Sequence, residues 1–377
     1  MNKSLVKRFG LLVLFVLITL MLVISCGEKK TEVVAPMSSQ EAVTLGLDNR
    51  QIQQVMAVQD RITPELMRNN EVVGTATGLT DDGQPAILVF LKSEEGAQAL
   101  KKADGKGTIP SVIESIPLVV QVTGEFKALV DLAGVSHTAK QTPPIQLGTS
   151  GGWRYDLANG YCCGGTLGSL VRIGGVQYIL SNYHVFESDI VAGGNSRVAT
   201  TGDPIIQPGL IDVGCNASSA QNVATLETKK SLPSSNVDAS VAKVLPGMVR
   251  TDGAILEIGT LSSSTIAAAL NQKVKKSGRT TGLTRSTVSG LNATISVAYD
   301  NECAGGAAFT KTFTGQIIIA NRASKFLAGG DSGSLLVQDV TSKPKAVGLL
   351  FAGSTSLAVA NPINQVLSFL GATMVGS

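Results

Sequence analysis

Two residues in the C-terminal half of the chain have the types that nucleophilic catalysis needs. Ser332 lies in the glycine-rich turn 329–333, Gly-Gly-Asp-Ser-Gly, which precedes the apolar run Leu335 to Val337. Glycines let a backbone turn sharply and point successive N–H groups at one spot. His184 follows the strand-like run 178–182, which places its imidazole at the edge of a sheet. Peptide hydrolysis needs a nucleophile, an activating base and donors for the oxyanion, so we expect Ser332 and His184 to act together.

Each motif also has a simpler interpretation. The glycine-rich stretch is compatible with a plain surface turn, and His184 with a core histidine whose nitrogens bind backbone groups. The chain has 2 histidines, and the other, His137, lies in an aperiodic stretch with Pro143 and Pro144 that we interpret as a linker. A histidine motif upstream of the serine turn favours the catalytic interpretation.

Both segments resemble motifs of trypsin-like, chymotrypsin-fold serine proteases. The run Tyr178–Val185 is similar to the histidine motif, and closer to the Asn-x-His-Val form of bacterial periplasmic members, while the turn around Ser332 is similar to the nucleophile motif. The resemblance spans about Gly164 to Leu370. It implies a double β-barrel and a serine endopeptidase that acts on protein or peptide substrates without a cofactor. It also implies an oxyanion hole formed by the N–H groups of Gly330 and Ser332.

The resemblance also points to the acid of the triad, because chymotrypsin-like chains carry it between the histidine and the serine. Asp238 lies near the start of the alternating segment Val237–Val244, which resembles the family's Asp-Ile-Ala-Leu strand. Asp238 would then orient His184. The competing acids follow His184 too closely to return to it after the intervening barrel strands; they are Asp189, Asp203 and Asp212.

A third segment, Val347–Ser354, resembles the strand that lines the primary specificity pocket and pairs with substrate backbone. Phe351, Ala352 and Gly353 are therefore expected pocket residues, although an ordinary core strand would show the same pattern. The family's pocket-base position, six residues before the nucleophile, falls on Phe326 and not on an acid. This predicts a preference for a small or apolar side chain over Arg or Lys.

Asp331 raises a question of activation. Secreted members of the family bury this aspartate against a new N-terminus made by cleavage, but here the resemblance begins far from the start of the chain. Asp331 therefore either pairs with an internal cation or awaits cleavage in the linker. The segment 276–284 resembles the opening of a second-barrel strand in less studied bacterial and plant members, and Arg279 in it is a candidate for a substrate role.

The first residues form a targeting segment. Lys3, Lys7 and Arg8 precede an apolar run from Gly10 to Ile24, which is typical of a signal peptide. The run ends in Leu-Val-Ile-Ser-Cys-Gly, which resembles the lipobox of bacterial lipoproteins, so we expect Cys26 to carry a lipid and become the mature N-terminus. An uncleaved single-pass anchor is the alternative, although the run is short for a bilayer span. The predicted location is extracytoplasmic, on a membrane bound through the lipid, facing the periplasm or at the cell surface.

Composition and charge limit the class of protein. A chain of 377 residues with 41 glycines and short apolar runs between recurring turns predicts two domains of mainly β structure. The formal charge of +3 resides in the targeting segment, and the lysine pairs 29–30 and 275–276 are interpreted as solvated. Nucleic acid is therefore not an expected partner, and the oligomeric state is left open.

The cysteines other than Cys26 suit an oxidising compartment. They are Cys162, Cys163, Cys215 and Cys303. Because adjacent cysteines seldom bond each other, the first two would pair with the last two in one of two ways. A metal site is not expected, since no Cys-x-x-Cys pair is present and histidines are few.

The predicted architecture is a C-terminal double β-barrel of chymotrypsin type preceded by a small α+β domain of unknown role. The boundaries are a signal peptide over 1–25, a tether over 26–37, the α+β domain over 38–130, a linker over 131–148 and the protease domain over 149–377. Within the α+β domain we expect a capping box at Ser38 and Glu41, a helix over 51–69 interrupted near Pro64, strands over 72–79, 85–91 and 118–126, and a helix over 94–102.

Three hypotheses for function remain. The first is a serine endopeptidase that works through an acyl-enzyme. The second is a catalytically silent binding or scaffold protein on the same fold, because a fold does not secure an activity. The third makes the α+β domain an inhibitory or partner-binding module of a regulated protease.

Overall fold

The computed structural model describes most of the chain after the targeting segment. The described residues are 44–102, 109–128, 137–158, 161–187, 197–299, 309–322 and 325–377. The signal peptide, Cys26, the tether and the capping box at Ser38 lie outside them, as do Asp189 and Cys303. In the ranges described, no helix is both long and apolar enough to cross a membrane.

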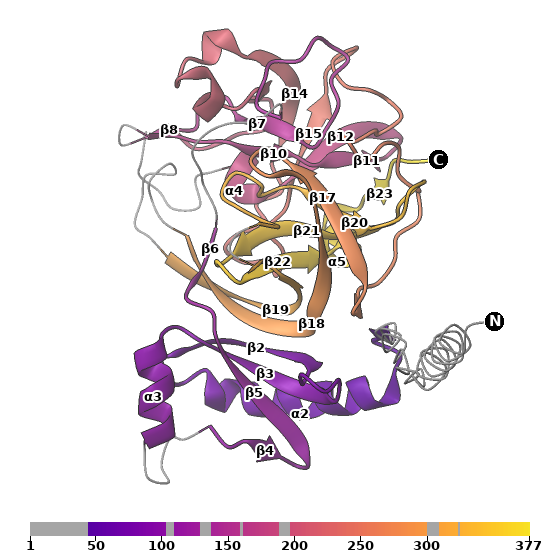
Figure 1. Cartoon of the computed structure of the whole chain (residues 1–377). Coiled ribbons are helices and arrows are strands. Elements are labelled where there is room, and N and C mark those ends of the chain that lie inside the picture. The colour runs from indigo at the N-terminus through magenta and orange to yellow at the C-terminus, as the bar shows by residue number, and fades with distance from the viewer. Residues whose placement is uncertain are drawn as a thin grey trace, which may run out of the picture. The chain divides into compact units, whose positions relative to one another are not determined.

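Six strands close into a barrel in the C-terminal part of the chain (Figure 1). They are β17 (Lys273–Gly278), β18 (Gly282–Tyr299), β19 (Phe309–Ala320), β20 (Leu335–Gln338), β21 (Ala346–Gly353) and β22 (Leu357–Pro362). The order is β17-β20-β21-β22-β19-β18, and the pairing of β17 with β18 closes the ring. Burial alternates along β18, where Ala293, Ile295, Val297 and Tyr299 face the core, as the two-residue period of a strand requires.

Another antiparallel sheet, built from residues that come earlier in the chain, forms the first barrel, so the six-stranded barrel above is the second. Its strands are β7 (Thr149–Trp153), β10 (Gly165–Leu167), β11 (Ser169–Ile173), β12 (Val176–Ser181), β13 (Pro204–Gln207), β14 (Gln221–Glu227), β15 (Ser240–Val244) and β23 (Thr373–Met374). The order is β10-β7-β13-β14-β15-β12-β11-β23. Only Gly168 separates β10 from β11, so one bent strand pairs with both β7 and β12 and curls the sheet on itself. The predicted double β-barrel of chymotrypsin type is confirmed.

Shorter elements complete the C-terminal part. They are α4 (Tyr183–Phe186), α5 (Ile363–Leu370), two 3-10 turns at Leu210–Val213 and Ala217–Ser219, and the two-residue strands β8 (Leu157–Ala158), β9 (Tyr161–Cys162) and β16 (Ala269–Leu270). The last of these pairs with β1 (Leu45–Gly46).

The N-terminal part is an α+β layer. It contains α2 (Arg50–Leu66), β2 (Val72–Leu79), β3 (Pro85–Leu91), α3 (Glu94–Lys102), β4 (Val112–Ile113) and β5 (Ile116–Val122). Both helices cover one face of the sheet, with Val55, Val58 and Ala97 packed on Ile87 and Val89 (Figure 1). The strands and the second helix have the predicted bounds, except for the last strand.

The predicted interruption of the first helix at Pro64 is wrong. The helix begins after Asn49, whose side chain caps the N–H groups of Gln51 and Ile52, and it continues through Pro64 to Leu66. A proline this close to the C-terminal end removes one backbone hydrogen bond without splitting the helix. Burial of the helix's apolar face offsets that loss.

The α+β layer shares a sheet with the second barrel. Strand β2 pairs with β18, so β2, β3 and β5 extend the barrel sheet outward. The predicted strand over 118–126 divides instead into β5 and a separate strand β6 (Phe126–Ala128), because Gly124 between them has a φ of 75°. Strand β6 pairs with both β18 and β21.

The described part of the expected linker, residues 137–148, packs into the barrels. Ile145 and Leu147 belong to the first barrel's hydrophobic core. His137 is buried, and its ring contacts Gly148 O at 2.9 Å and Glu257 Oε2 at 2.7 Å. The interpretation of His137 as a linker residue is therefore wrong, since it ties this segment to Glu257.

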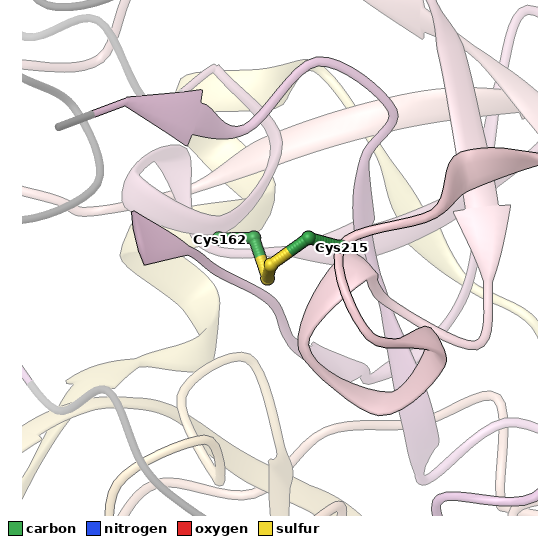
Figure 2. Close-up of a disulfide and its surroundings, with 2 residues drawn as sticks. All are labelled: Cys162 and Cys215. Carbon is green, nitrogen blue, oxygen red and sulfur yellow. A yellow bond between two sulfur atoms is a disulfide. The ribbon is translucent and has the colours of Figure 1, made fainter. Parts of the chain in front are cut away.

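A disulfide joins Cys162 to Cys215, with 5.5 Å between their Cα atoms (Figure 2). It connects the end of β9 to the chain just after the 3-10 turn Leu210–Val213. Cys163 is disulfide-bonded as well. Of the two pairings that the sequence left open, the structure has the one that bonds Cys162 to Cys215.

Candidate active site

The imidazole of His184 and the carboxylate of Asp238 are in hydrogen-bond contact. His184 lies in the one-turn helix α4, directly after β12, and Asp238 lies two residues before β15, the neighbour of β12 in the sheet. The distance from His184 Nδ1 to Asp238 Oδ2 is 2.6 Å. Asp238 is fully buried, and 12% of the His184 side chain is exposed.

The second oxygen of Asp238 is fixed by backbone donors of α4. The N–H of Tyr183 donates to Asp238 Oδ1 at 2.7 Å, and the N–H of His184 does so at 3.3 Å. Asn182 and Asn361 hold the backbone of Asp238 through bonds to its carbonyl and its N–H. These bonds set the carboxylate in one orientation relative to the histidine.

A further donor reaches the same carboxylate. The Tyr299 hydroxyl, at the end of β18, donates to Asp238 Oδ2 at 2.9 Å, and the Tyr299 ring lies edge-on to the His184 ring with centroids 5.9 Å apart. Burial, together with the Asp238 charge, raises the pKa of Tyr299 well above its ordinary value, so the phenol stays a neutral donor.

The other acids proposed as partners for His184 have different contacts. Asp203 accepts from Trp153 Nε1 at 3.0 Å. Asp212 accepts two bonds from Arg279, at 2.7 Å and 2.6 Å. Asp189 lies outside the described residues. Among the described acids, the structure therefore brings Asp238 to the histidine.

The turn that carries Ser332 depends on glycine. Gly330 and Gly333 have φ values of 84° and 91°, which side chains rarely adopt. Thr166 of β10 holds the turn from outside: its hydroxyl donates to Gly330 O at 2.9 Å and its N–H to Ser332 O at 2.9 Å. The Ser332 hydroxyl lies 3.5 Å from Phe351 O, on β21.

The histidine and serine segments meet at Gly165. A methyl group placed on this glycine would lie 2.6 Å from Val185 Cγ2 and 2.9 Å from Ser332 O, so only glycine fits between them. Within the described residues, His184 Nε2 has no hydrogen-bond partner, and no bond joins it to Ser332 Oγ. Such contacts are often long in unliganded enzymes and tighten when substrate binds.

Asp331 pairs with an internal cation. Lys276 Nζ lies 3.2 Å from Asp331 Oδ2, and both side chains are fully buried. Lys276 also donates to Thr281 and to Gly282 O. Burial lowers the Lys276 pKa, and the Asp331 charge opposes that shift. The interpretation of the lysine pair 275–276 as solvated is therefore wrong, since Lys276 is fully buried and Lys275, whose ammonium donates to Val340 O at 2.7 Å, is 5% exposed.

Backbone groups complete the shell around Asp331. The N–H groups of Thr280 and Thr281 donate to its Oδ1 at 2.9 Å and 3.2 Å, and that of Ala328 donates to Oδ2 at 3.0 Å. The Thr281 hydroxyl adds a bond of 2.7 Å to Oδ2. The carboxylate of Asp331, the residue before Ser332, is thus held by four hydrogen-bond donors and one cation.

Arg279 is a structural residue in this arrangement. Its side chain is 1% exposed and forms the bidentate pair with Asp212, which also accepts from the Ser150 hydroxyl at 2.5 Å. The Arg279 N–H donates to the Thr166 hydroxyl at 3.0 Å. Arg279 therefore joins the two barrels behind the serine turn and is not placed to meet a substrate.

The expected pocket residues lie beside Ser332 but are closely packed. The ring centroids of Phe351 and Phe313 are 4.8 Å apart, and Phe326 packs in the second barrel's core. A methyl group on Gly353 would lie 2.9 Å from Leu327 Cδ2. Ala352 is fully buried. The Leu327 side chain therefore occupies the space that the absent side chain of Gly353 leaves, so there is little room next to Gly353 for a large substrate side chain.

Two residues of this site, Tyr299 and Lys276, are not indicated by any motif of the sequence. Tyr299 ends a strand whose alternation predicts burial, but nothing in the sequence indicates that its hydroxyl reaches Asp238. Lys276 was assigned to solvent because it stands beside another lysine. Burial is continuous from Val274 to Gly278, so a two-residue period along β17 gives no signal for Lys276.

Comparisons with known proteins give matches of limited extent. The family model described as the Nal1 C-terminal domain matches residues 229–361, which include Asp238 and Ser332 but not His184. No curated protein matches the chain.

Solved structures of bacterial proteases are similar at low identity. Thermobifida fusca protease A is 20% identical over 62% of this chain and 99% of its own, with a TM-score of 0.41. Cellulomonas bogoriensis chymotrypsin is 20% identical over 62% of this chain and 99% of its own, with a TM-score of 0.37. A glutamic acid specific serine protease is 20% identical over 61% of this chain and all of its own, with a TM-score of 0.40. The strand order of the two barrels, and not these scores, carries the fold assignment.

Proposed function

We propose that this protein is a serine endopeptidase. The observation that carries the proposal is the contact of 2.6 Å between His184 Nδ1 and a fully buried Asp238, beside the glycine turn of Ser332. A carboxylate fixed by two backbone N–H groups and a tyrosine keeps the proton of the imidazole on Nδ1, which leaves Nε2 as the base. No role in packing requires this tautomer.

In the proposed reaction, His184 Nε2 removes the Ser332 hydroxyl proton as Oγ attacks the substrate carbonyl. The oxyanion is bound by the N–H groups of Gly330 and Ser332, and the protonated imidazole then gives its proton to the leaving amine. Water hydrolyses the acyl-enzyme with His184 again as base. Asp238 stabilises the imidazolium and does not itself take the proton.

The Lys276–Asp331 pair supports activity without a new N-terminus. Secreted relatives order this aspartate by a cleavage, whereas here a buried lysine already neutralises it. Removing a buried carboxylate from water is costly unless a cation and hydrogen bonds compensate it. Asp331 has both, so the serine turn is held in place in the intact chain.

The proposed substrate is a polypeptide with a small or apolar residue at the bond that is cut. No acid stands at position 326, and Leu327 crowds the space next to Gly353. Cleavage of denatured casein, followed by mass-spectrometric mapping of the new termini, would test this preference.

Labelling with a fluorophosphonate tests the proposed function. We expect wild-type protein to become phosphonylated on Ser332, and Ser332→Ala to remain unlabelled. The matched control is Ser334→Ala, which removes a nearby hydroxyl that donates to Asp331 O and should leave the labelling intact. Failure to label the wild type would refute the proposal and favour a silent binding protein on a protease fold.

We further propose that the protein is a lipoprotein bound to a membrane through Cys26 outside the cytoplasm. The support is the sequence pattern of the targeting segment. Expression with labelled palmitate should give a labelled wild type and an unlabelled Cys26→Ala. Equal labelling of both would refute the anchor without affecting the proposed chemistry.

A further inference from the structure

One edge of β21 carries three segments in a row. At its start, Ala346 to Leu349 pair with β20. The turn after Ser332 comes next, where Gly333 N–H donates to Leu350 O at 2.9 Å and the Ser332 hydroxyl lies 3.5 Å from Phe351 O. Strand β6 then pairs with Ala352 and Gly353. The opposite edge of β21 is taken by β22 over the same residues, so β6 must lie on the edge of the nucleophile.

The direction of β6 leads toward Ser332. The strand is antiparallel to β21, with Lys127 opposite Gly353 and Ala128 opposite Ala352. From Lys127 to Ala128 the strand therefore runs toward the level of Phe351, where the Ser332 hydroxyl lies. An extended peptide bound to this edge for cleavage would need the same place and would add to the sheet as one more strand.

Strand β6 is held there on its other side too. It pairs in parallel with the end of β18, with Phe126 opposite Val297 and Lys127 opposite Ala298, one residue before Tyr299. A strand edge can pair with only one strand at a time, so β6 occupies the edges of both β18 and β21 at these residues.

An aromatic cluster anchors β6 to the α+β layer. The Phe126 side chain is 1% exposed, and its ring meets that of Phe90 on β3 edge-on with centroids 5.9 Å apart. The same cluster contains Tyr183, Tyr299 and Phe351 of the candidate active site. Burying the Phe126 side chain removes its apolar surface from water and so stabilises the docked position of this short strand.

We propose that β6 is a built-in ligand of the β21 edge at Ala352 and Gly353, where it takes the place of an extended peptide substrate. The proposal rests on the proposed function, since the edge matters only if Ser332 is the nucleophile. The intact chain then blocks large substrates but admits small reagents to Ser332. The segment 44–128 acts as an inhibitor in cis, and peptide hydrolysis requires β6 to leave.

Two reagents distinguish whether Ser332 is accessible from whether the edge of β21 is accessible. Diisopropyl fluorophosphate is small and needs only Ser332, whereas fluorescein-labelled casein must bind as an extended strand. The test variant of the full chain is Lys127→Pro. Proline has no backbone N–H, so β6 loses the hydrogen bond that residue 127 donates to one of its two neighbouring strands. The matched control is Lys127→Ala, which keeps that N–H.

We expect all three proteins to react with diisopropyl fluorophosphate at rates within about threefold of one another, because the small reagent does not use the edge. Casein hydrolysis should be slow in wild type and in Lys127→Ala. It should rise on the order of tenfold in Lys127→Pro, because losing a ladder bond of β6 raises the fraction of chains with an open edge.

The outcomes are distinct. Equal casein hydrolysis by Lys127→Pro and Lys127→Ala, with normal labelling of both, would overturn the built-in ligand and leave the proposed function standing. No labelling of any of the three proteins would refute the proposed function, and this inference with it. If Lys127→Pro alone fails to label, that variant has lost its fold; Phe126→Ala, which removes the anchor of β6, must then show the same rise in casein hydrolysis, and its absence would overturn the inference.

Discussion

The pair Lys276–Asp331 lends itself to a quantitative test. Replacing Lys276 with methionine keeps the length of the side chain but leaves Asp331 as an unpaired buried charge. At the distance of 3.2 Å and an effective dielectric constant of about 20, the lost attraction is about 5 kcal/mol. The four hydrogen bonds to Asp331 remain and offset part of that loss. We expect Lys276→Met to lower the free energy of unfolding by about 3–5 kcal/mol.

A double-mutant cycle isolates the pair from the packing of each side chain. Asp331→Asn removes the anion, and the variant with both substitutions leaves no charge in the site. We expect the double variant to be more stable than the sum of the two single losses by at least about 2 kcal/mol, because neither partner is then unpaired. Unfolding in guanidinium chloride, followed by circular dichroism, measures each free energy.

The pH dependence of the same variants has a defined sign. Burial lowers the Lys276 pKa below its ordinary value of 10.5, and Asp331 raises it. In Asp331→Asn that support is lost and the pKa falls further. A lysine with a lowered pKa in the folded state contributes stability above pH 10.5, which is lost as the pH falls through the folded pKa. Asp331→Asn should therefore lose stability relative to the double variant as the pH falls from about 10 to 7.

Labelling of Ser332 connects this pair to the site. Because Asp331 precedes the nucleophile, Lys276→Met should slow labelling by diisopropyl fluorophosphate even where the protein stays folded. Lys273→Met, at the exposed first residue of the same strand, is the matched control and should label at the wild-type rate. If the free energy of unfolding of Lys276→Met lies within about 0.5 kcal/mol of the wild-type value, the reasoning is refuted, because leaving the buried Asp331 carboxylate without its cation should cost more than that.

Three further outcomes follow from the structure. Tyr299→Phe removes the hydroxyl that donates to Asp238 and should lower the free energy of unfolding by about 1.5–3 kcal/mol, measured by guanidinium unfolding. Burial raises the Glu187 pKa above its ordinary value of 4.5, so the wild type should lose stability relative to Glu187→Gln as the pH rises from about 4 to 7; a constant difference in melting temperature would contradict this. Replacing Cys162 and Cys215 together with serine opens a loop with a sequence separation of 53 and should cost about 4 kcal/mol by loop entropy.

Much of the barrel fold was predictable because its signals are local. Alternating apolar residues and glycine turns set strand positions, and a two-residue period leaves few choices of face. The turn around Ser332 was predictable for the same reason: a glycine with a φ near 84° must stand at 330, whatever the rest of the chain does. His184 and Asp238 were found through their motifs.

The missed features depend on contacts between distant segments. The bond from Tyr299 to Asp238 joins residues 61 apart, and the ion pair of Lys276 with Asp331 depends on which face of β17 meets the serine turn. The pairing of β6 with β21 was beyond reach, since a three-residue strand has almost no pattern of its own. Register between such segments is a property of the assembled sheet.

The Lys276–Asp331 pair and the pairing of β6 with β21 bear on one question, which is how the activity of this site would be controlled. In an enzyme whose aspartate waits for a new N-terminus, the serine turn itself is unformed until cleavage. Here the buried Lys276 supplies that charge from within the second barrel, so the turn needs no such event. Under the proposed function, Ser332 would then be controlled through access of the substrate. In the proposed mechanism a polypeptide substrate binds as a strand along the edge of β21 next to Phe351, and β6 already pairs with that edge. An ordered catalytic turn and an occupied substrate edge are therefore complementary, and the activity of the full chain should be limited by the release of β6, not by the assembly of the site.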